Sequence, residues 1–554
     1  MEKNLILAIV LSTAFLLVYY TFLQPSPPAV PPPVLNRTAS SANTGDSASS
    51  AAQVSAAAAT ETLTNESIFQ KIEEETRPIS ALERVTLSNG SISMGFIKDW
   101  GNLSDWRLKK FNESDTESVN LLKTPGYQST LPLKLDVVAG GETVVFGLPE
   151  ITEPAPGRLD FIFRGGALTV TKSFFLEKDK YAVDFGVKIE NTSGDKVVLD
   201  SIALSWVNFL AGAEADIVKK SDIAMLNSIY SRGGQVKTLS MAKKSSGFMG
   251  LFGKKKQDTA KEVVTDIGNN NEWVGFEDRY FALVIFQDKA AVNSVEFRQN
   301  MEKGSFFRVS YKGVAVEPGT PYSLKYRIFG GPKDYAVLKE YGIEKLGSMG
   351  FFSPLARLMI SIMKFFYSIF GNYGIAIIML TLIVKIILYP LNHISLKSMR
   401  EMQQLQPHIE ELKKKFKNSK DKLNAAMMEL YKERKVNPLS GCLPILIQLP
   451  IFIALYSALQ KAVELRRADF MFWINDLSVA DPLYIMPILM GISMFAQQKM
   501  SVTDPRQAQM AYMMPVIFTV FFINLPSGLV LYWFVQNLLS IAQQYYVNKK
   551  YHLK

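Results

Sequence analysis

The stretch TLIVKIILYPL, residues 381–391, places one lysine inside an apolar run that begins near Tyr373 and ends at Leu391. The run spans about 19 residues, which is enough to cross a hydrocarbon core about 30 Å thick. A lysine in the middle of such a crossing costs at least about 2.5 kcal/mol, so it usually faces a protein interior or a water-filled cavity. We therefore expect the chain after Lys385 to build a polar cavity around this side chain.

The apolar stretches near the C-terminus carry further polar side chains, more than contact with lipid alone explains. They are Thr381, Gln448, Gln497, Gln498, Tyr532, Gln536 and Asn537. Buried amides seek either protein partners or water, so two interpretations stay open. The side chains form hydrogen bonds between the helices of a bundle, or they line a hydrated groove open to the cytoplasm. For Lys385, the alternative to the groove is a side chain that snorkels toward the membrane surface.

Six membrane spans are predicted in all, five of them in the C-terminal core. They are an N-terminal signal anchor within 1–24, the span 373–391, and four apolar stretches within 441–548, at 443–462, 482–496, 512–523 and 529–547. The N-terminal stretch is longer than the apolar part of a usual signal peptide and precedes no small-residue cleavage motif, which predicts an uncleaved anchor. The positive-inside rule places the basic segment 392–440 and the basic tail 549–554 in the cytoplasm.

Residues 65–345 predict β-structure rather than helices. Short runs of alternating polarity recur there and are separated by Gly, Asn and Asp, as in LDFIFRG (159–165), YAVDFGVKIEN (181–191) and FFRVSYKGVAV (306–316). This pattern indicates a large antiparallel β-sandwich outside the membrane. The segment 25–64, rich in Pro, Ala and Ser, predicts a linker between anchor and sandwich. The predicted fold class is therefore a multi-domain α+β membrane protein, with a periplasmic β-sandwich and a helical transmembrane bundle.

Three shorter segments have patterns of their own. Residues 346–372 are apolar except for Arg357 and Lys364, which share one helical face, and they predict an amphipathic helix in the membrane interface. Residues 392–440 predict a basic helical hairpin, because apolar residues recur there at helical spacing. The segment 241–257 carries Phe, Met and Leu between two lysine clusters. It is either a loop that touches lipid or a disordered loop between two strands.

The charges and the rare reactive residues limit the possible functions. The chain has 61 Lys and Arg against 51 Asp and Glu, and the basic excess lies where topology requires it. One cysteine, Cys442, and three histidines nearly exclude a His/Cys metal cluster. No nucleophile with a base and no paired carboxylates can be singled out. We therefore expect no catalysis, no cofactor and no metal site.

Four long C-terminal runs resemble the YidC family of membrane protein insertases, which is related to the mitochondrial oxidase-assembly and chloroplast Albino proteins. They are GNYGIAIIMLTLIVKIILYPL (371–391), KVNPLSGCLPILIQLPIFIALY (435–456), DPLYIMPILMGISMFAQQKM (481–500) and MMPVIFTVFFINLPSGLVLYWFVQNLLSIAQQ (513–544). The anchor and sandwich before them resemble the Gram-negative form. The resemblance implies an ATP-independent insertase and chaperone of the bacterial inner membrane, with both termini cytoplasmic. Its expected partners are nascent inner-membrane proteins, membrane lipid and the Sec translocon. The resemblance implies that it acts either alone or beside the translocon.

The resemblance also implies roles for single residues. The family's positive charge in a cytoplasm-open groove corresponds to Lys385, although arginine is the commonest residue there. Lysine keeps the charge but loses the planar fork that binds a carboxylate through two bonds. The same resemblance assigns Thr381, Tyr532 and Trp533 to contact with the passing segment. Gln448, Gln498 and Asn537 complete the expected groove, and the hairpin 392–440 with the basic tail would receive the ribosome.

Three other functions remain as alternatives. The main one is a small-solute transporter or channel with an external β-sandwich, although no carboxylate lies in the middle of any predicted span, where coupled transporters generally need one. A second places the function in the sandwich, as a carbohydrate-binding or sugar-modifying module. A third makes the hairpin a nucleic-acid binder, which its few aromatic residues and interspersed acids disfavour. We expect no recognition of a specific nucleic-acid sequence.

Overall fold

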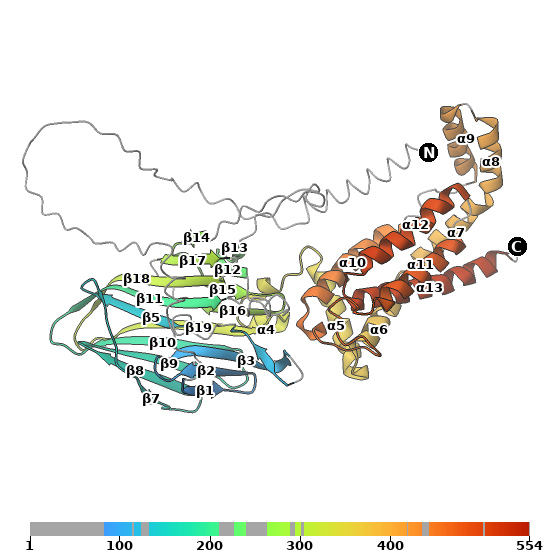
Figure 1. Ribbon diagram of the computed structural model, residues 1–554. Helices are drawn as coiled ribbons and strands as arrows, with labels where there is room; N and C mark the ends of the chain where they lie inside the picture. The colour runs from blue at the N-terminus through green and yellow to red at the C-terminus, as the bar shows by residue number, and fades with distance from the viewer. Residues whose placement is uncertain are drawn as a thin grey trace, which may run out of the picture. The chain divides into compact units, whose positions relative to one another are not determined.

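The computed structural model describes residues 82–113, 116–122, 132–209, 227–239, 263–287, 294–300, 304–417, 419–434, 443–501 and 505–552. The predicted anchor 1–24, the linker 25–64 and the loop 241–257 lie outside the described residues. The chain divides into two compact units at Pro332 and Lys333. Strands build the first unit and helices build the second (Figure 1).

The β unit contains three antiparallel sheets. The strand order is β13-β12-β15-β16-β19-β10-β9-β8-β7 in the nine-stranded sheet, β14-β17-β18-β11-β5-β6 in the six-stranded sheet and β1-β2-β3-β4 in the four-stranded sheet. In chain order the strands are β1 (Arg84–Ser88), β2 (Ile92–Ile97), β3 (Asn102–Asn112), β4 (Ser118–Asn120), β5 (Lys134–Ala139), β6 (Glu142–Thr143), β7 (Glu150–Thr152), β8 (Arg158–Gly165), β9 (Leu168–Leu176), β10 (Ala182–Asn191), β11 (Val197–Phe209), β12 (Asn227–Arg232), β13 (Gln235–Leu239), β14 (Val263–Asp266), β15 (Trp273–Glu277), β16 (Phe281–Phe286), β17 (Ser294–Asn300), β18 (Gly304–Val316) and β19 (Tyr322–Pro332). Antiparallel sheets in this region were predicted from the alternating runs, and the structure confirms them.

The core of the β unit is aromatic and lies against one face of the nine-stranded sheet. Phe276 of β15 contacts Phe307 of the six-stranded sheet, with ring centroids 5.3 Å apart. Phe174 of β9 contacts Phe96 of the four-stranded sheet at 4.5 Å. The indole of Trp106 donates a hydrogen bond to the carbonyl of Gly330 at 3.1 Å. The six-stranded and four-stranded sheets therefore both cover the nine-stranded sheet, which makes this unit a sandwich with a divided second layer.

Lys172 is a buried lysine where the three sheets meet. Its Nζ donates hydrogen bonds to Asn102 Oδ1 at 2.8 Å, to the Leu133 carbonyl at 3.0 Å and to the Trp100 carbonyl at 3.1 Å. Burial lowers the pKa of Lys172 to about 7, against an opposing attraction from Asp136. The lysine therefore links β9 to the segments that open β3 and β5.

The unfolding free energy of the β unit is expected to rise with pH between about 7 and 10.5, because of Lys172. In this window the unfolded chain still holds the lysine proton, whereas the folded chain has released it. The contribution of Lys172 to the unfolding free energy rises by at most about 1.4 kcal/mol per pH unit. Denaturation of the full chain, followed by tryptophan fluorescence across this range, measures the effect. The Lys172→Met variant is the control. If the unfolding free energies of the two proteins depended equally on pH, Lys172 would not be the cause of the effect.

The helical unit follows the last strand. Its elements are α4 (Tyr335–Glu340), η5 (Glu344–Gly347), α5 (Ser353–Phe370), α6 (Tyr373–Ile387), α7 (Tyr389–Gln404), α8 (Gln406–Lys415), α9 (Lys420–Glu433), α10 (Leu443–Lys461), η7 (Val463–Leu465), α11 (Ile485–Ser501), α12 (Pro505–Phe522) and α13 (Ser527–His552). Its core is made by buried apolar residues of several helices, including Ile377 and Leu380 of α6, Leu455 and Leu459 of α10, Met490 of α11, and Leu529 and Val530 of α13.

The division at Pro332 lies before the predicted end of the sandwich at residue 345. Strand β19 ends at Pro332, and Asp334 then caps α4 by accepting hydrogen bonds from the backbone N–H groups of Ala336 and Val337. The chain therefore turns from strand to helix at this point, and α4 and η5 group with the helical unit.

Helix α6 ends shortly after Lys385, at a bend. Among the described residues, no single helix has both the length and the apolarity needed to cross a membrane. Tyr373–Ile387 and Tyr389–Met402 meet those requirements only as a pair, bent by 64° at the break between them. Pro390 explains the break, because proline lacks the backbone N–H and clashes with the preceding turn. The bend was not predicted, and the count of six spans stays a prediction.

The predicted hairpin 392–440 contains most of α7, followed by α8 and α9. Leu405 and Ile409 are buried there, and Met427 and Leu430 of α9 pack against them. Helix α8 ends on three consecutive lysines, 413–415, beside its C-terminal carbonyl groups. Cations are favoured at that end by the helix dipole. The hairpin is thus a small two-helix layer with a basic tip.

Candidate functional site

Lys385 lies against α13. The residue is only 7% exposed, and its Nζ donates a hydrogen bond to Ser540 Oγ at 2.7 Å. Ser540 Oγ in turn donates to the Gln536 carbonyl at 2.8 Å. An ammonium group has three N–H donors, and the described residues supply one acceptor. The side chain therefore points into the bundle in this structure instead of snorkelling outward.

A polar stripe runs along the face of α13 that Lys385 contacts. We define it as Tyr532, Gln536, Ser540 and Gln543, which recur at intervals of four, four and three residues and so share one helical face. Gln448 Nε2 of α10 donates a hydrogen bond to the Tyr532 hydroxyl. The stripe therefore connects α13 to α6 through Lys385 and to α10 through Gln448.

The stripe also holds acceptors to spare. Gln543 Nε2 donates to the Tyr389 carbonyl at the start of α7, at 3.5 Å. The Oε1 atoms of Gln536 and Gln543 are buried, and no described residue donates a hydrogen bond to either of them. An unpaired buried acceptor costs about 1–3 kcal/mol. Ser540 and Gln543 were not identified from the sequence, although their spacing from Gln536 was a usable signal.

Two of the predicted groove residues have hydrogen-bond partners within the protein, and one of these bonds joins two helices. The buried Thr381 donates its hydroxyl to the Ile377 carbonyl of its own helix, at 2.7 Å. Asn537 Nδ2 of α13 donates to Ser493 Oγ of α11 at 3.0 Å. The bond between Asn537 and Ser493 joins two helices, and such interhelical bonds contribute about 0.6 kcal/mol in membrane proteins. Gln498 lies half-buried on α11. The interpretation as hydrogen bonds between helices therefore applies to Asn537, whereas the hydrated groove stays a prediction.

Trp533 lies in an aromatic cluster beside the stripe. Its ring centroid is 5.3 Å from Phe452 of α10, 5.4 Å from Phe522 and 6.4 Å from Phe518 of α12. The cluster joins the three helices α10, α12 and α13. Residues 532 and 533 thus place a polar contact and an apolar contact side by side on α13.

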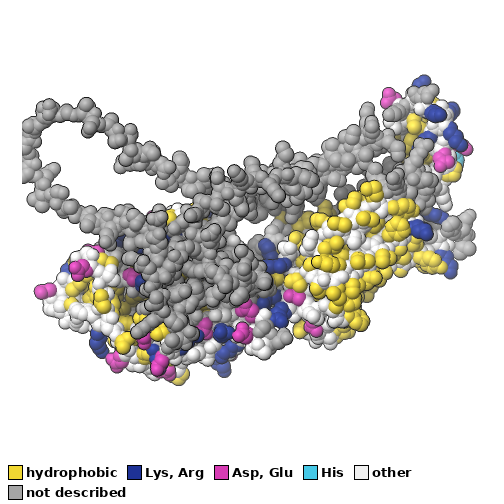
Figure 2. Space-filling model, viewed as in Figure 1, with side chains coloured by type: hydrophobic (Ala, Val, Ile, Leu, Met, Phe, Trp, Pro, Cys, Tyr) yellow, Lys and Arg dark blue, Asp and Glu magenta, His cyan; other side chains and the backbone are white. Residues whose placement is uncertain are grey.

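The surface of the helical unit carries a broad apolar area (Figure 2). Exposed apolar side chains on α11 and α12 include Ile488, Ile492, Val516, Ile517, Val520 and Phe521. Exposed apolar patches of this kind mark contact with a membrane or a protein. No group of three or more His, Cys, Asp or Glu is placed to hold a metal ion within the described ranges.

Comparisons with known proteins point to one family across both units. The family model described as "60Kd inner membrane protein" matches residues 365–554, and the one described as "YidC periplasmic domain" matches residues 84–362. Strands β1 to β19 are therefore the region matched by the periplasmic model, together with α4 and part of α5. The polar stripe and Lys385 fall in the inner-membrane model.

Curated relatives and a solved structure carry the same name. The membrane protein insertase YidC of Citrifermentans bemidjiense is 34% identical over 565 residues, covering 99% of this chain and 99% of the relative. That of Geotalea daltonii is 34% identical over 569 residues, with the same coverage of 99% and 99%. A crystal structure described as an active YidC insertase has a TM-score of 0.38 at 20% identity, covering 84% of this chain and 96% of that chain. From the two family models and the full-length relatives, the chain belongs to the YidC family of membrane protein insertases.

Proposed function

We propose that Lys385 and the polar stripe of α13 form the place where this insertase receives its inner-membrane protein substrates. The observation that carries the proposal is a lysine, 7% exposed, set in an apolar helix and bonded to a polar face of another helix. A buried charge of this kind is expensive, and in a membrane protein it usually marks a functional site. Asn537 and Thr381 support this place structurally, and Trp533 provides an apolar contact beside it.

The proposed mechanism uses attraction, hydrogen bonding and burial. Lys385 attracts acidic residues in the short polar tail that must cross the membrane, and the attraction is stronger than in water because the surroundings are less polar. The spare amide oxygens of Gln536 and Gln543 accept hydrogen bonds from the tail, which lowers the cost of removing it from water. The apolar segment of about 20 residues then moves into lipid, where its burial makes the step downhill. No nucleotide is needed.

The proposal also includes the membrane topology of the chain and its protein partners. Both termini and the hairpin formed by α8 and α9 lie in the cytoplasm, and the β unit lies in the periplasm. The basic tip of α8 and the basic tail receive the ribosome, and the chain works alone or beside the Sec translocon. The distribution of Lys and Arg supports this arrangement, because cytoplasmic loops carry the positive excess.

A photo-crosslinker at Trp533 tests the insertion path. The full-length protein is reconstituted in liposomes and presented with ribosome-stalled nascent chains of a single-span membrane protein. We expect a crosslink only at the chain lengths at which the span has just left the ribosome. A crosslinker at Leu538, an exposed position on the same helix, is the control for contact with substrate already in lipid.

The outcomes distinguish insertion along Lys385 and the polar stripe from other functions. A crosslink at Trp533 that precedes the one at Leu538 supports the proposal. A crosslink at Leu538 alone would place the path on the lipid face of α13. No crosslink at either position would assign the polar residues to holding the bundle together, and solute flux without a nascent chain would then favour the transporter.

A further inference from the structure

We propose that Asp334, Lys364 and Glu464 form an ionic latch that positions the α5–α6 pair of helices, and with it Lys385. This inference rests on the proposed role of Lys385, because the latch acts on insertion through the helix that carries this lysine. We call Lys364 a positioning residue, since it acts through α6 and contacts no substrate. The latch joins three elements that are separate in sequence, namely the start of α4, the middle of α5 and the short helix η7.

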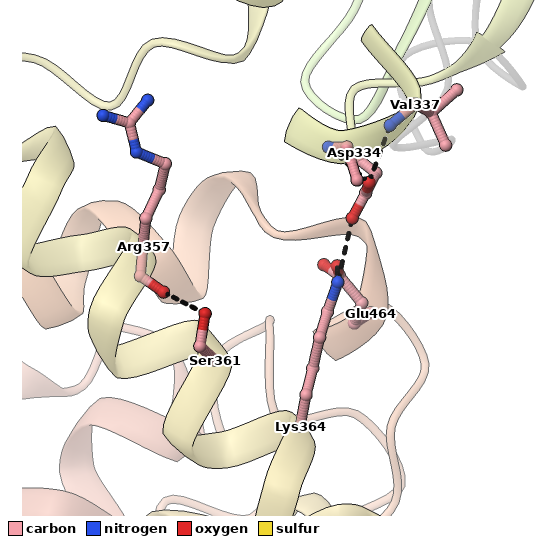
Figure 3. A network of polar contacts seen from close by, with 7 residues as sticks. Asp334, Val337, Arg357, Ser361, Lys364 and Glu464 are labelled. Carbon is pink, nitrogen blue, oxygen red and sulfur yellow. Dashed lines mark hydrogen bonds and ion pairs between the residues drawn. The ribbon is translucent and has the colours of Figure 1, made fainter. Parts of the chain in front are cut away.

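The latch is built around one ammonium group and two carboxylates (Figure 3). Lys364 Nζ lies 2.9 Å from Asp334 Oδ2 and 2.5 Å from Glu464 Oε1. The carboxylates are mostly buried, with side-chain exposures of 17% for Asp334 and 18% for Glu464, whereas Lys364 is 43% exposed. Screening by water is therefore weaker here than for a fully exposed pair.

Two of the three groups of the latch, Lys364 and Asp334, keep their charge near neutral pH. Burial would raise the pKa of Asp334, but hydrogen bonds with Glu464, Lys364 and the Val337 backbone lower it to about 2. Burial would lower the pKa of Lys364, but the two carboxylates raise it well above its ordinary value. Burial and the hydrogen bond with Asp334 raise the pKa of Glu464. Lys364 therefore stays protonated while Asp334 stays ionised.

Asp334 also caps the first helix of the helical unit. Its Oδ1 caps α4 by accepting from the backbone N–H groups of Ala336 at 2.8 Å and Val337 at 3.1 Å, so its two oxygens have separate tasks. Asp334 lies two residues after the end of β19. A second contact between α4 and α5 lies nearby, where the Arg357 guanidinium stacks over the Tyr335 ring at 4.4 Å.

Glu464 connects the latch to the loop that follows α10. The same loop binds the junction between α5 and α6, because Asn372 Nδ2 donates to the Phe470 carbonyl at 2.8 Å while its Oδ1 caps α6 through the Ile375 N–H at 3.0 Å. Gly374 allows the close approach, since a Cβ there would lie 1.9 Å from the Phe470 ring. Lys364 and Asn372 thus attach α5 and the start of α6 to one loop, and Lys385 lies on α6 three turns beyond.

The attachment at Lys364 is polar, which makes it separable from the core. The buried apolar residues of α5, among them Met359 and Met363, pack into the helical core whether or not the latch is formed. Removing the latch should therefore shift α5 and α6 without unfolding the bundle. Mutations that change coupling of this kind have a roughly twofold to thirtyfold effect.

The test measures insertion by the full-length protein in liposomes, per folded molecule. Lys364→Met is expected to slow insertion roughly tenfold, whereas Lys339→Met, which removes an exposed lysine of α4 outside the latch, leaves the rate unchanged. The double variant Lys364→Glu with Glu464→Lys keeps one ammonium between two carboxylates, and we expect it to restore most of the rate. Lys364→Met with an unchanged rate, or a double variant as slow as Lys364→Glu alone, would overturn the latch.

A covalent replacement separates positioning from stability. In a Cys442→Ser background, Lys364→Cys with Glu464→Cys is expected to insert slowly, and to recover when a short thiol-to-thiol crosslinker joins the two cysteines. If the latch only supported folding, the variants would lose folded protein and melt earlier while each folded molecule inserted normally, which would contradict the proposal. Lys385→Glu is measured alongside. A normal insertion rate for Lys385→Glu would refute the proposed role of Lys385. The insertion rate of Lys364→Met would still decide whether the latch affects insertion.

Discussion

Replacing Lys385 with glutamate is expected to lower the insertion rate of substrates with acidic tails by at least roughly a hundredfold. Two unit charges 4 Å apart interact by about 4 kcal/mol at an effective dielectric constant of 20. The substitution converts that attraction into repulsion at the position that contacts Ser540. The measurement is the protease-protected fraction of a single-span substrate in liposomes that contain the full-length variant.

Lys385→Arg and Lys385→Met are the controls for charge and for burial. Arginine keeps the positive charge and should preserve insertion, because simple attraction does not need the compact geometry of lysine. Methionine removes the charge without adding repulsion, so its rate should fall between those of the other two variants. A substrate whose tail acids are changed to lysines should lose its dependence on a positive charge. Equal rates for Lys385→Glu and the unaltered protein would refute attraction by charge.

Replacing Gly275 with alanine is expected to destabilise the β unit by about 3 kcal/mol or more. Gly275 lies in the middle of β15, where it pairs with Val284 of β16. A Cβ there would lie 2.0 Å from the Leu283 carbonyl oxygen. Because this atom belongs to the backbone of a buried neighbouring strand, it cannot move aside as a side chain could. Chemical denaturation of the full chain measures the loss of stability.

Gly186→Ala is the matched control for that substitution. Gly186 also lies within a strand of the nine-stranded sheet, but the nearest atom to its Cβ would be Ser173 Cβ at 3.9 Å. Alanine therefore fits there, and the reduced freedom of the unfolded chain stabilises the fold by up to about 1 kcal/mol. Similar losses at both positions would show that the sheet tolerates neither side chain and would refute the contact with Leu283 as the cause.

The β-rich and helical halves of the chain could be predicted because each has a local signal. Strand runs such as 159–165 alternate in polarity every second residue, and the helices of the hairpin repeat apolar residues every third or fourth. The candidate site was found in a similar way, since Lys385 breaks an apolar run. The family could also be predicted from the sequence, because long runs such as 513–544 resemble those of the YidC family and follow one another in the same order.

The partners of the site residues depended on the tertiary structure. Lys385 and Ser540 are 155 positions apart, and Gln448 and Tyr532 are 84 apart. No local pattern states which faces of two helices meet, because that depends on how all the side chains between them pack. The bend before α7 had a local cause in Pro390, but its angle of 64° depends on the helices around it.

The sequence by itself therefore determined the class of each segment, the family and the lysine within an apolar run, Lys385, since these depend on composition and spacing along the chain. The tertiary structure decided which polar residues have partners on another helix, as for Asn537, and which keep spare acceptors, as for Gln536 and Gln543. It also brought Asp334 and Glu464 to Lys364. The physical reason is that the hydrophobic periodicity of a segment depends only on residues close together in sequence. Hydrogen bonds and ion pairs between elements depend on packing in three dimensions.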